Sequence, residues 1–332
     1  MDAYYQSSTT CISAAKAPFK LVVSIHKTLF SPSTEHQKAG PTLLFAHANG
    51  FFKEIWYPLL IRLCRAGFQG TCITYDVRNQ GDSGLINNPI QHQVEGYSMT
   101  MTDNTEDVMA VIRGLGLKGP LIGIGHSMGG MALMKTELHH PGTFQRIVAI
   151  DPTIYVESQA RLKEDEVVHG FIAFAMKKPS RWSSRDEAWD ALRKHPYYAN
   201  WHPEMLATFV QHGLISDPNR KGVELKSSAA EECSIYRHHQ HQATNMSKEV
   251  KDLRLPIHYL CGRRSRMIPM AMAVHTAMNT KNSELMIMAK GTHMVLMEEI
   301  DRIAAEISRI LHHAQAQPQS HSPAFSSMLA HL

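Results

Sequence analysis

A serine enclosed by glycines is the residue in this chain best suited to chemistry. Ser127 stands in the run Gly-His-Ser-Met-Gly, after apolar residues 121–124 and before a helical pattern over residues 128–138. A serine on a sharp strand-to-helix turn exposes its hydroxyl, and such a turn leaves no room for side chains at positions 125 and 129, where glycines stand. The pattern predicts a nucleophilic serine. The alternative is a glycine-rich turn with a surface serine.

A serine hydroxyl needs a base within hydrogen-bond reach, and the base needs a third group that orients it. Among the 21 histidines we choose His293, because it follows the last predicted strand, residues 284–288. The chain order nucleophile, acid, histidine requires a histidine there. A purely structural His293 is the alternative.

The carboxylate is the least obvious partner. In the commonest form of such a fold it follows the seventh strand, but residues 262–269 contain no Asp or Glu. The end of the sixth predicted strand, residues 146–150, also lies beside the histidine loop, and Asp151 stands there. We therefore predict that Asp151 orients His293. An Asp before Pro152 that only forms a turn is the alternative.

Two backbone N–H groups are expected to hold an oxyanion. Met128 is the first residue of the predicted helix, where backbone N–H groups lack partners and the helix dipole is positive. Asn49 lies in the loop His47-Ala48-Asn49-Gly50-Phe51 after the predicted strand at residues 42–46. This loop is in position to supply the second N–H group. A plain strand-to-helix turn is the alternative.

These residues require a sheet whose strand ends meet at one edge. Strands alternate with helices up to residue 153 and again from residue 251 to residue 313, which predicts one α/β core made of residues 16–153 and 251–313. Between them, residues 154–250 carry helical, charged and aromatic segments and are expected to form a helical cap. Residues 314–332 are polar and contain proline, which predicts a disordered tail.

Composition excludes several classes of function. The net charge of +4 is spread along the chain, which argues against a nucleic-acid partner. No apolar run approaches the roughly 18 residues that span a bilayer. The five cysteines form no Cys-x-x-Cys pair and are expected to be reduced thiols of an intracellular protein. Composition leaves an oligomer open.

We predict neither a metal nor a cofactor. The run of His238, His239 and His241 has no carboxylate or cysteine at ligand spacing, so a solvated surface is the favoured interpretation. Serine chemistry of the predicted kind requires no cofactor.

Four motifs together carry a family resemblance: GHSMGG at residues 125–130, HANGF at 47–51, DVRNQGDSG at 76–84 and GTH at 291–293. In this order they resemble the α/β-hydrolase superfamily over residues 19–313. The resemblance implies a mostly parallel central sheet flanked by helices, with a helical cap after strand six. The acid after strand six, with the cap residues 184–188 and 201–213, is similar to fungal peroxisomal hydrolases. That group includes a yeast peroxisomal lipase, AK-toxin biosynthesis hydrolases and an acyl-CoA hydrolase of the mycophenolic acid pathway.

The resemblance implies a serine hydrolase that cleaves an acyl-CoA thioester or a carboxylic ester, in a fungal peroxisomal pathway to a toxin-like secondary metabolite. A peroxisomal lipase or carboxylesterase, a non-hydrolytic acyltransferase or lyase, and a non-catalytic binding protein are the alternatives. An epoxide hydrolase or dehalogenase is disfavoured, because its nucleophile is an Asp where this chain has Ser127.

The last three residues, Ala330, His331 and Leu332, conform to the small-basic-leucine form of a peroxisomal address. We therefore expect a peroxisomal import receptor as a partner and a peroxisomal location, with a cytoplasmic one as the alternative. The acyl substrate is expected to be a small molecule. If it is a coenzyme A thioester, its phosphates are expected to contact cations of the cap. The alternative is that these cations only form a solvated surface. The candidate cations are Arg161, Lys163, Lys177, Lys178, Arg181 and Arg185.

Overall fold

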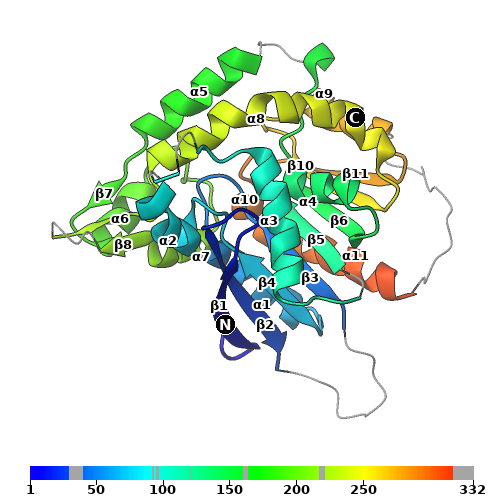
Figure 1. Ribbon diagram of the computed structural model, residues 1–332, viewed down its shortest axis with the longest axis horizontal. Coiled ribbons are helices and arrows are strands. Elements are labelled where there is room, and N and C mark those ends of the chain that lie inside the picture. The colour runs from blue at the N-terminus through cyan, green and yellow to red at the C-terminus, as the bar shows by residue number, and fades with distance from the viewer. Residues whose placement is uncertain are drawn as a thin grey trace.

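The computed structural model describes residues 1–29, 40–91, 93–94, 97–119, 121–159, 164–216 and 221–316. Its centre is an eight-stranded sheet in the order β1-β2-β4-β3-β5-β6-β10-β11 (Figure 1). The pairs β1·β2 and β2·β4 are antiparallel and all the other pairs are parallel. The strands are β1 (Tyr5–Ser13), β2 (Lys20–Thr28), β3 (Thr42–Ala46), β4 (Thr71–Tyr75), β5 (Leu121–His126), β6 (Phe144–Ile150), β10 (Ile257–Gly262) and β11 (Ser283–Met288).

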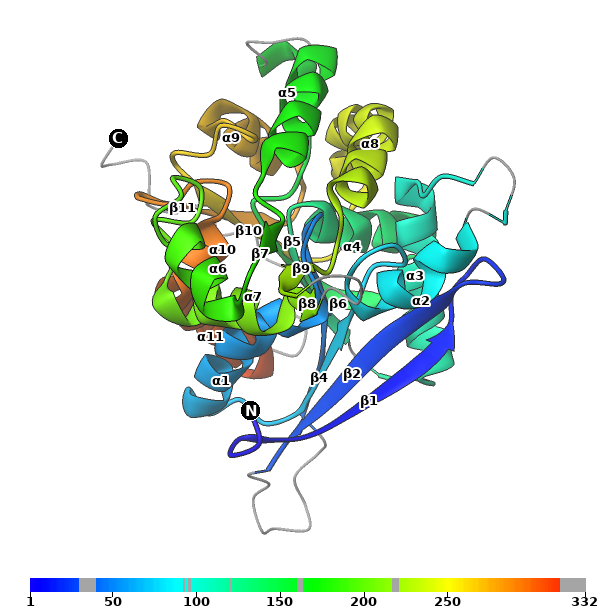
Figure 2. The ribbon, with the colours of Figure 1, turned by 90° about the vertical axis from the view of Figure 1, so that its left-hand side faces the viewer.

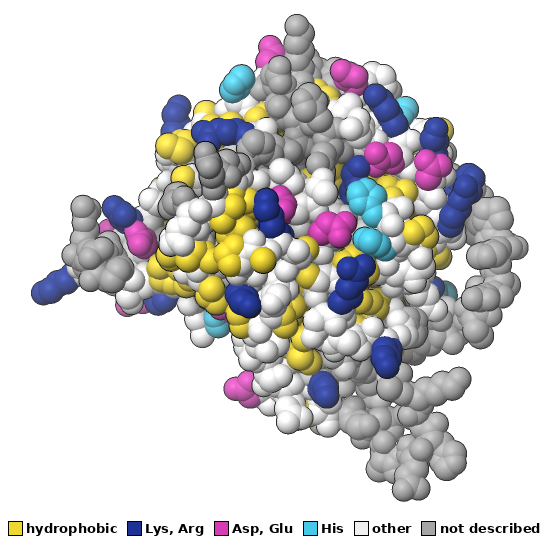
Figure 3. Space-filling model, in the orientation of Figure 1, with side chains coloured by type: hydrophobic (Ala, Val, Ile, Leu, Met, Phe, Trp, Pro, Cys, Tyr) yellow, Lys and Arg dark blue, Asp and Glu magenta, His cyan; other side chains and the backbone are white. Residues whose placement is uncertain are grey.

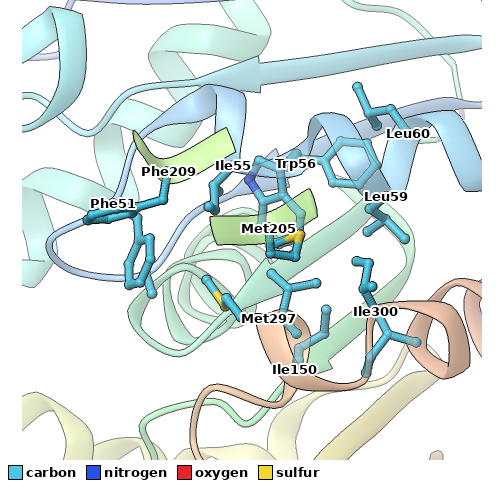
Figure 4. Packing of buried hydrophobic residues seen from close by; sticks show 14 of the residues in the cluster. Phe51, Ile55, Trp56, Leu59, Leu60, Ile150, Met205, Phe209, Met297 and Ile300 are labelled. Carbon is cyan, nitrogen blue, oxygen red and sulfur yellow. The ribbon is translucent and has the colours of Figure 1, made fainter. Parts of the chain in front are cut away.

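Two hydrophobic clusters cover the two faces of the sheet. Side chains alternate along a strand, so Leu43 and Phe45 of β3 join one cluster and Leu44 joins the other. Figure 4 shows the first cluster, where Trp56 packs among residues of α1 and α11. The flanking helices are η1 (Lys53–Trp56), α1 (Tyr57–Arg65), α2 (Gly81–Gln91), α3 (Met101–Gly114), α4 (Met128–His139), α9 (Met270–Asn279), α10 (Val295–Glu298) and α11 (Ile300–Ala316).

The segment expected to be a helical cap, residues 154–250, is not purely helical. It contains a small sheet in the order β7-β9-β8 beside its helices. Strands of two or three residues are too short for an alternating pattern to reveal them. The elements are η2 (Glu157–Gln159), α5 (Glu164–Lys177), β7 (Arg181–Trp182), α6 (Arg185–Leu192), α7 (Pro203–His212), β8 (Leu214–Ser216), β9 (Val223–Leu225), α8 (Ala229–Glu249) and η3 (Val250–Asp252).

Helix α8 connects this segment to the core. Its first part lies beside α5, and its last turns place Ala243 and Met246 in the hydrophobic cluster that also contains residues of α3 and α4. Figures 1 and 2 show α5 as the outermost helix above α8. The segment is therefore joined to the core by a continuous helix as well as by loops.

The core begins earlier than residue 16, where the sequence analysis placed its start. Strand β1 pairs with β2 along its whole length, from Tyr5 opposite Thr28 to Ser13 opposite Lys20. It is an edge strand with most of its side chains exposed, so it lacks the apolar alternation that marks a half-buried strand. Its polar sequence therefore gave no strand signal.

Charged side chains of both signs are interspersed on the face of the molecule shown in Figure 3. Among the helices of the described part of the chain, none has the length and apolar character needed to cross a membrane.

Candidate active site

Ser127 lies on the turn between β5 and α4, in a strained backbone conformation. Its φ of 55° and ψ of −120° fall outside the regions that residues with a Cβ normally occupy. The neighbouring glycines are required by close packing: a Cβ on Gly129 would come within 2.1 Å of the Ala46 carbonyl oxygen, and one on Gly125 within 2.5 Å of the Gly130 nitrogen. The turn therefore has the geometry that the glycine spacing predicts.

His293 follows β11 and joins Ser127 to Asp151. Its Nε2 lies 2.8 Å from Ser127 Oγ, and its Nδ1 lies 2.6 Å from Asp151 Oδ2. The carboxylate accepts a hydrogen bond from Nδ1–H, so Nε2 carries no proton and accepts a hydrogen bond from the serine hydroxyl. All three are buried: Ser127 is 4% exposed, His293 8% and Asp151 0%. The structure thus brings together the three residues that the sequence analysis selected separately.

Asp151 is held from the loop that follows β10. Its Oδ1 accepts a hydrogen bond from the Gly262 N–H (3.0 Å), and its Oδ2 accepts one from Ser265 Oγ (2.7 Å). Ser265 is itself buried and accepts the Ile268 N–H (3.1 Å). These two hydrogen bonds fix the rotamer of the carboxylate, so that Oδ2 faces His293. No sequence pattern predicts this role for Ser265, because a single serine in a loop has no spacing that marks it.

His126, next to the serine, supports the histidine loop. Its Nε2 donates to the His293 carbonyl oxygen (2.8 Å), while its Nδ1 has no partner among the described residues. Burial, the largest cause, lowers the pKa of His126 to about 3, so the ring is neutral. It therefore holds the His293 backbone without adding a charge beside the base. The sequence analysis missed this residue.

The two residues expected to supply oxyanion donors lie where β3 ends against the start of α4. Within the described residues, neither the Met128 nor the Asn49 backbone N–H makes a hydrogen bond to protein. The Asn49 side chain is occupied: its Nδ2 donates to the Glu232 carbonyl oxygen over 3.0 Å. Only the backbone of Asn49 is therefore available to a ligand.

Three of the cap cations considered for phosphate binding already have partners. Lys178 forms a buried ion pair with Glu232, and Arg181 pairs with Glu224 over 2.9 Å. Arg185 donates to two backbone carbonyl oxygens of the cap. Lys177 is exposed, whereas Arg161 and Lys163 lie outside the described residues. In the described part of the cap, fewer of the candidate cations are therefore available to phosphates than the sequence analysis expected.

Other predicted features fall outside the described residues. The side chains of His238, His239 and His241 are among them, as are residues 317–332 of the predicted tail, with Ala330, His331 and Leu332. The first three residues of that tail, 314–316, are not disordered as predicted but continue α11. In the part of the chain that the structure describes, no three His, Cys, Asp or Glu side chains form a group that could hold a metal ion.

A sequence model of the alpha/beta hydrolase family matches residues 43–306, which include the strained serine turn, Asp151 and His293. The chain belongs to this family. The fold predicted from the motifs is confirmed, since a mostly parallel sheet flanked by helices is what the structure shows. As an alpha/beta hydrolase with a thioesterase among its relatives, the protein is a hydrolytic enzyme.

The relatives of this hydrolase include fungal proteins of the predicted kind. It is 24% identical over 308 residues to the peroxisomal membrane protein LPX1 of Saccharomyces cerevisiae, covering 85% of this chain and 78% of that protein. It is 28% identical over 181 residues to the type I acyl-CoA thioesterase mpaH of Penicillium brevicompactum, covering 52% of this chain and 40% of that protein. The Alternaria alternata abhydrolase domain-containing protein AFT2-1 is 24% identical over 110 residues, 33% of this chain and 38% of that protein. The resemblance to these fungal hydrolases is confirmed.

The solved structure of the Saccharomyces cerevisiae peroxisomal alpha-beta-hydrolase Lpx1 has the same fold as this hydrolase. The two superpose with a TM-score of 0.76 at 19% identity, covering 97% of this chain and 93% of that one. At this identity the likeness establishes the fold alone.

Proposed function

We propose that the protein is a serine hydrolase that cleaves an acyl thioester or a carboxylic ester through Ser127, His293 and Asp151. The observation that carries this proposal is the continuous hydrogen-bond chain from Asp151 through His293 to a serine on a strained turn. Strain of this kind persists where the surrounding structure holds it, and it is common at catalytic residues.

In the proposed reaction Ser127 Oγ attacks the acyl carbon while His293 Nε2 takes its proton. Asp151 stabilises the imidazolium that forms. The backbone N–H groups of Met128 and Asn49 stabilise the tetrahedral oxyanion. His293 then protonates the leaving thiolate or alkoxide, and a water molecule, activated by the same histidine, hydrolyses the acyl-enzyme. As the acyl bond breaks, His293 passes the proton from this water to Ser127 Oγ, and the carboxylic acid leaves, which restores the starting state.

We favour an acyl-CoA thioester as the substrate, because a Penicillium relative carries the name type I acyl-CoA thioesterase. The source organisms of these two relatives, Alternaria alternata and Penicillium brevicompactum, support a place in fungal metabolism, for which we propose a pathway to a secondary metabolite. Lys178 and Arg181 of the cap give no further support to a coenzyme A thioester, because both already form ion pairs with glutamates. An oxyester, as a lipase or carboxylesterase would cleave, is the second candidate, and transfer of the acyl group to a second acceptor or lyase chemistry is the third.

A peroxisomal location is part of the proposal, because the yeast relative LPX1 is a peroxisomal membrane protein. A fluorescent protein fused to the N-terminus should give a punctate signal that overlaps a peroxisomal marker. Deleting residues 330–332 should make this signal diffuse, because the import receptor would lose its address. A diffuse signal from the intact fusion would contradict the location and leave the chemistry untouched.

Two experiments test the chemistry. A fluorophosphonate probe should label Ser127, located by peptide mass spectrometry, which separates a hydrolase from a binding protein of the same fold. A panel of acyl-CoA thioesters and matched oxyesters, with free acid measured as product and with alcohol and thiol acceptors added, separates hydrolysis from transfer. If the probe labels no residue and no free acid forms from any of these substrates, the proposed function is wrong.

A further inference from the structure

The peptide group between Ala48 and Asn49 is held firmly on its carbonyl side. The Ala48 oxygen accepts hydrogen bonds from His47 Nδ1 (2.8 Å) and from the Phe51 N–H (3.2 Å). A trans peptide is planar, with its N–H pointing opposite to its C=O. Fixing the Ala48 carbonyl therefore fixes the direction of the Asn49 N–H, the group that we propose as an oxyanion donor.

The tautomer of His47 follows from its other nitrogen. Nε2 accepts a hydrogen bond from the Val77 backbone N–H over 3.0 Å, so Nε2 carries no proton of its own. The remaining proton is on Nδ1, which points at Ala48. Burial, the largest cause, lowers the pKa of His47 to about 4. The ring is therefore neutral near neutral pH and acts as a constant donor.

Gln80 holds the other side of the same loop. Its Oε1 accepts the Gly50 N–H (3.1 Å), and its Nε2 donates to Asn49 Oδ1. One fully buried side-chain amide thus restrains both the side chain of Asn49 and the peptide group that follows it. The orientation of this amide is unambiguous, because only its oxygen can accept from a backbone N–H.

The cap completes the support of this loop. Asn49 Nδ2 donates to the Glu232 carbonyl oxygen of α8. The Glu232 carboxylate also packs on Gly50, where an added Cβ would come within 3.0 Å of it. Gly50 has a positive φ of 81°, which favours glycine there.

We propose that His47 and Gln80 are positioning residues that aim the Asn49 N–H at the oxyanion. This inference rests on the proposed function and deepens it. Both side chains are fully buried and hydrogen-bond to the loop between β3 and η1, so we assign them an action through this loop and not through contact with the substrate. It also assigns a role to the polar motif at residues 76–84, whose glutamine holds the loop across the sheet edge.

The first test replaces Gln80 with Met, which keeps the length of the side chain and removes both hydrogen bonds. We expect kcat to fall about tenfold to a hundredfold, somewhat less than the loss of an oxyanion donor itself. KM should change little. The affinity for a trifluoromethyl ketone, whose hemiketal oxyanion mimics the tetrahedral intermediate, should fall by the same factor as kcat/KM. The pH profile should keep its midpoint, because His293 and Asp151 are untouched.

Asn87→Ala is the matched control. Asn87 is also fully buried. Its side-chain amide hydrogen-bonds to the backbone of Lys20 and Arg78 and not to Asn49 or Gly50. It should lower the melting temperature while leaving kcat and the analogue affinity unchanged. This separates loss of oxyanion geometry from loss of stability.

A second pair of variants keeps the inference testable if Gln80→Met does not fold. The amide of Asn in His47→Asn can reproduce the Nδ1 donor, whereas His47→Leu removes it. We expect His47→Asn to retain at least tenfold more kcat than His47→Leu at equal folded fraction. The inference is overturned if Gln80→Met stays within twofold of the wild type, or if the two His47 variants are equal. A wild-type protein that hydrolyses no ester or thioester would overturn the proposed function and this inference together.

Discussion

Ser265 Oγ donates a hydrogen bond to Asp151 Oδ2 over 2.7 Å, and the same oxygen faces His293 Nδ1 at 2.6 Å. Ser265 lies in the loop after β10, which contains no carboxylate. The loop thus contributes a hydroxyl to the acid that the neighbouring strand supplies. A side chain at position 265 is one hydrogen bond away from the oxygen on which His293 depends.

Asp151→Asn should lower turnover by about four powers of ten. The amide keeps the shape of the carboxylate, but its nitrogen cannot accept the Nδ1 proton, so the wrong tautomer of His293 is favoured. Turnover is measured with the best substrate of the panel. Asp252→Asn, at an exposed aspartate in η3 before β10, is the control and should have little effect. If Asp151→Asn keeps most of its turnover while another carboxylate proves essential, Asp151 is not the acid.

Adding Ser265→Asp to Asp151→Asn should restore part of the lost turnover, at least tenfold. The new carboxylate would start from a position whose hydroxyl already reaches the atom that faces His293. Ser308→Asp in the same background is the control, because Ser308 lies on α11 and bonds only its own helix. Equal turnover in the two double variants would show that position 265 cannot serve His293.

Ser127→Ala should lower turnover on the order of a million-fold and leave the fold intact. Only the attacking oxygen is removed, and the turn accepts a smaller side chain. Turnover and the circular dichroism spectrum are measured on the same preparation, with Ser308→Ala as a control. Activity near that of the wild type in the pure variant would rule out Ser127 as the nucleophile.

Lys178→Ala should lower the free energy of unfolding by about 3 kcal/mol or more, because it leaves Glu232 buried without a counter-charge. Arg181→Ala is the control: Arg181 pairs with Glu224, but its side chain is 59% exposed, and such pairs contribute at most about 1 kcal/mol. Denaturant unfolding measures both. Equal losses in the two variants would contradict a special role for the buried pair.

Stability should fall as the pH is lowered from about 6.5 to about 4. Burial, the main cause, lowers the pKa of His26 from 6.5 to about 4. Between these two pH values His26 is protonated in the unfolded chain and neutral in the folded chain. The stability that His26 contributes is therefore complete above pH 6.5 and decreases by about 1.4 kcal/mol per pH unit in this window. The free energy of unfolding is measured across the window. In His26→Gln the slope should be smaller by this amount, and an unchanged slope would contradict the prediction.

Local sequence patterns were sufficient for the turn at Ser127, because glycine spacing and an apolar strand are local properties. The choice of Asp151 and His293 also required the order of strands and catalytic residues along the chain in such a fold. Local patterns were also sufficient for α4, expected at residues 128–138 and observed as Met128–His139.

The supporting residues were beyond the reach of sequence patterns. Gln80 bonds a loop some thirty residues earlier in the chain, and Ser265 bonds a carboxylate more than a hundred residues away. Their roles depend on which strand ends become neighbours in the sheet. Edge strand β1 was not predicted for a different reason: few of its side chains are buried, so its sequence lacks apolar alternation.

Helix α8 contacts the proposed oxyanion loop near its first turn and the core near its last, where Glu249 pairs with Lys135 of α4. Its 21 residues make a rod of roughly 30 Å. Because both of its ends are held, α8 sets the distance between the loop at Asn49 and helix α4. Amide hydrogen exchange should therefore be slow beside both Glu232 and Met246, and Lys178→Ala should speed it beside Glu232 first.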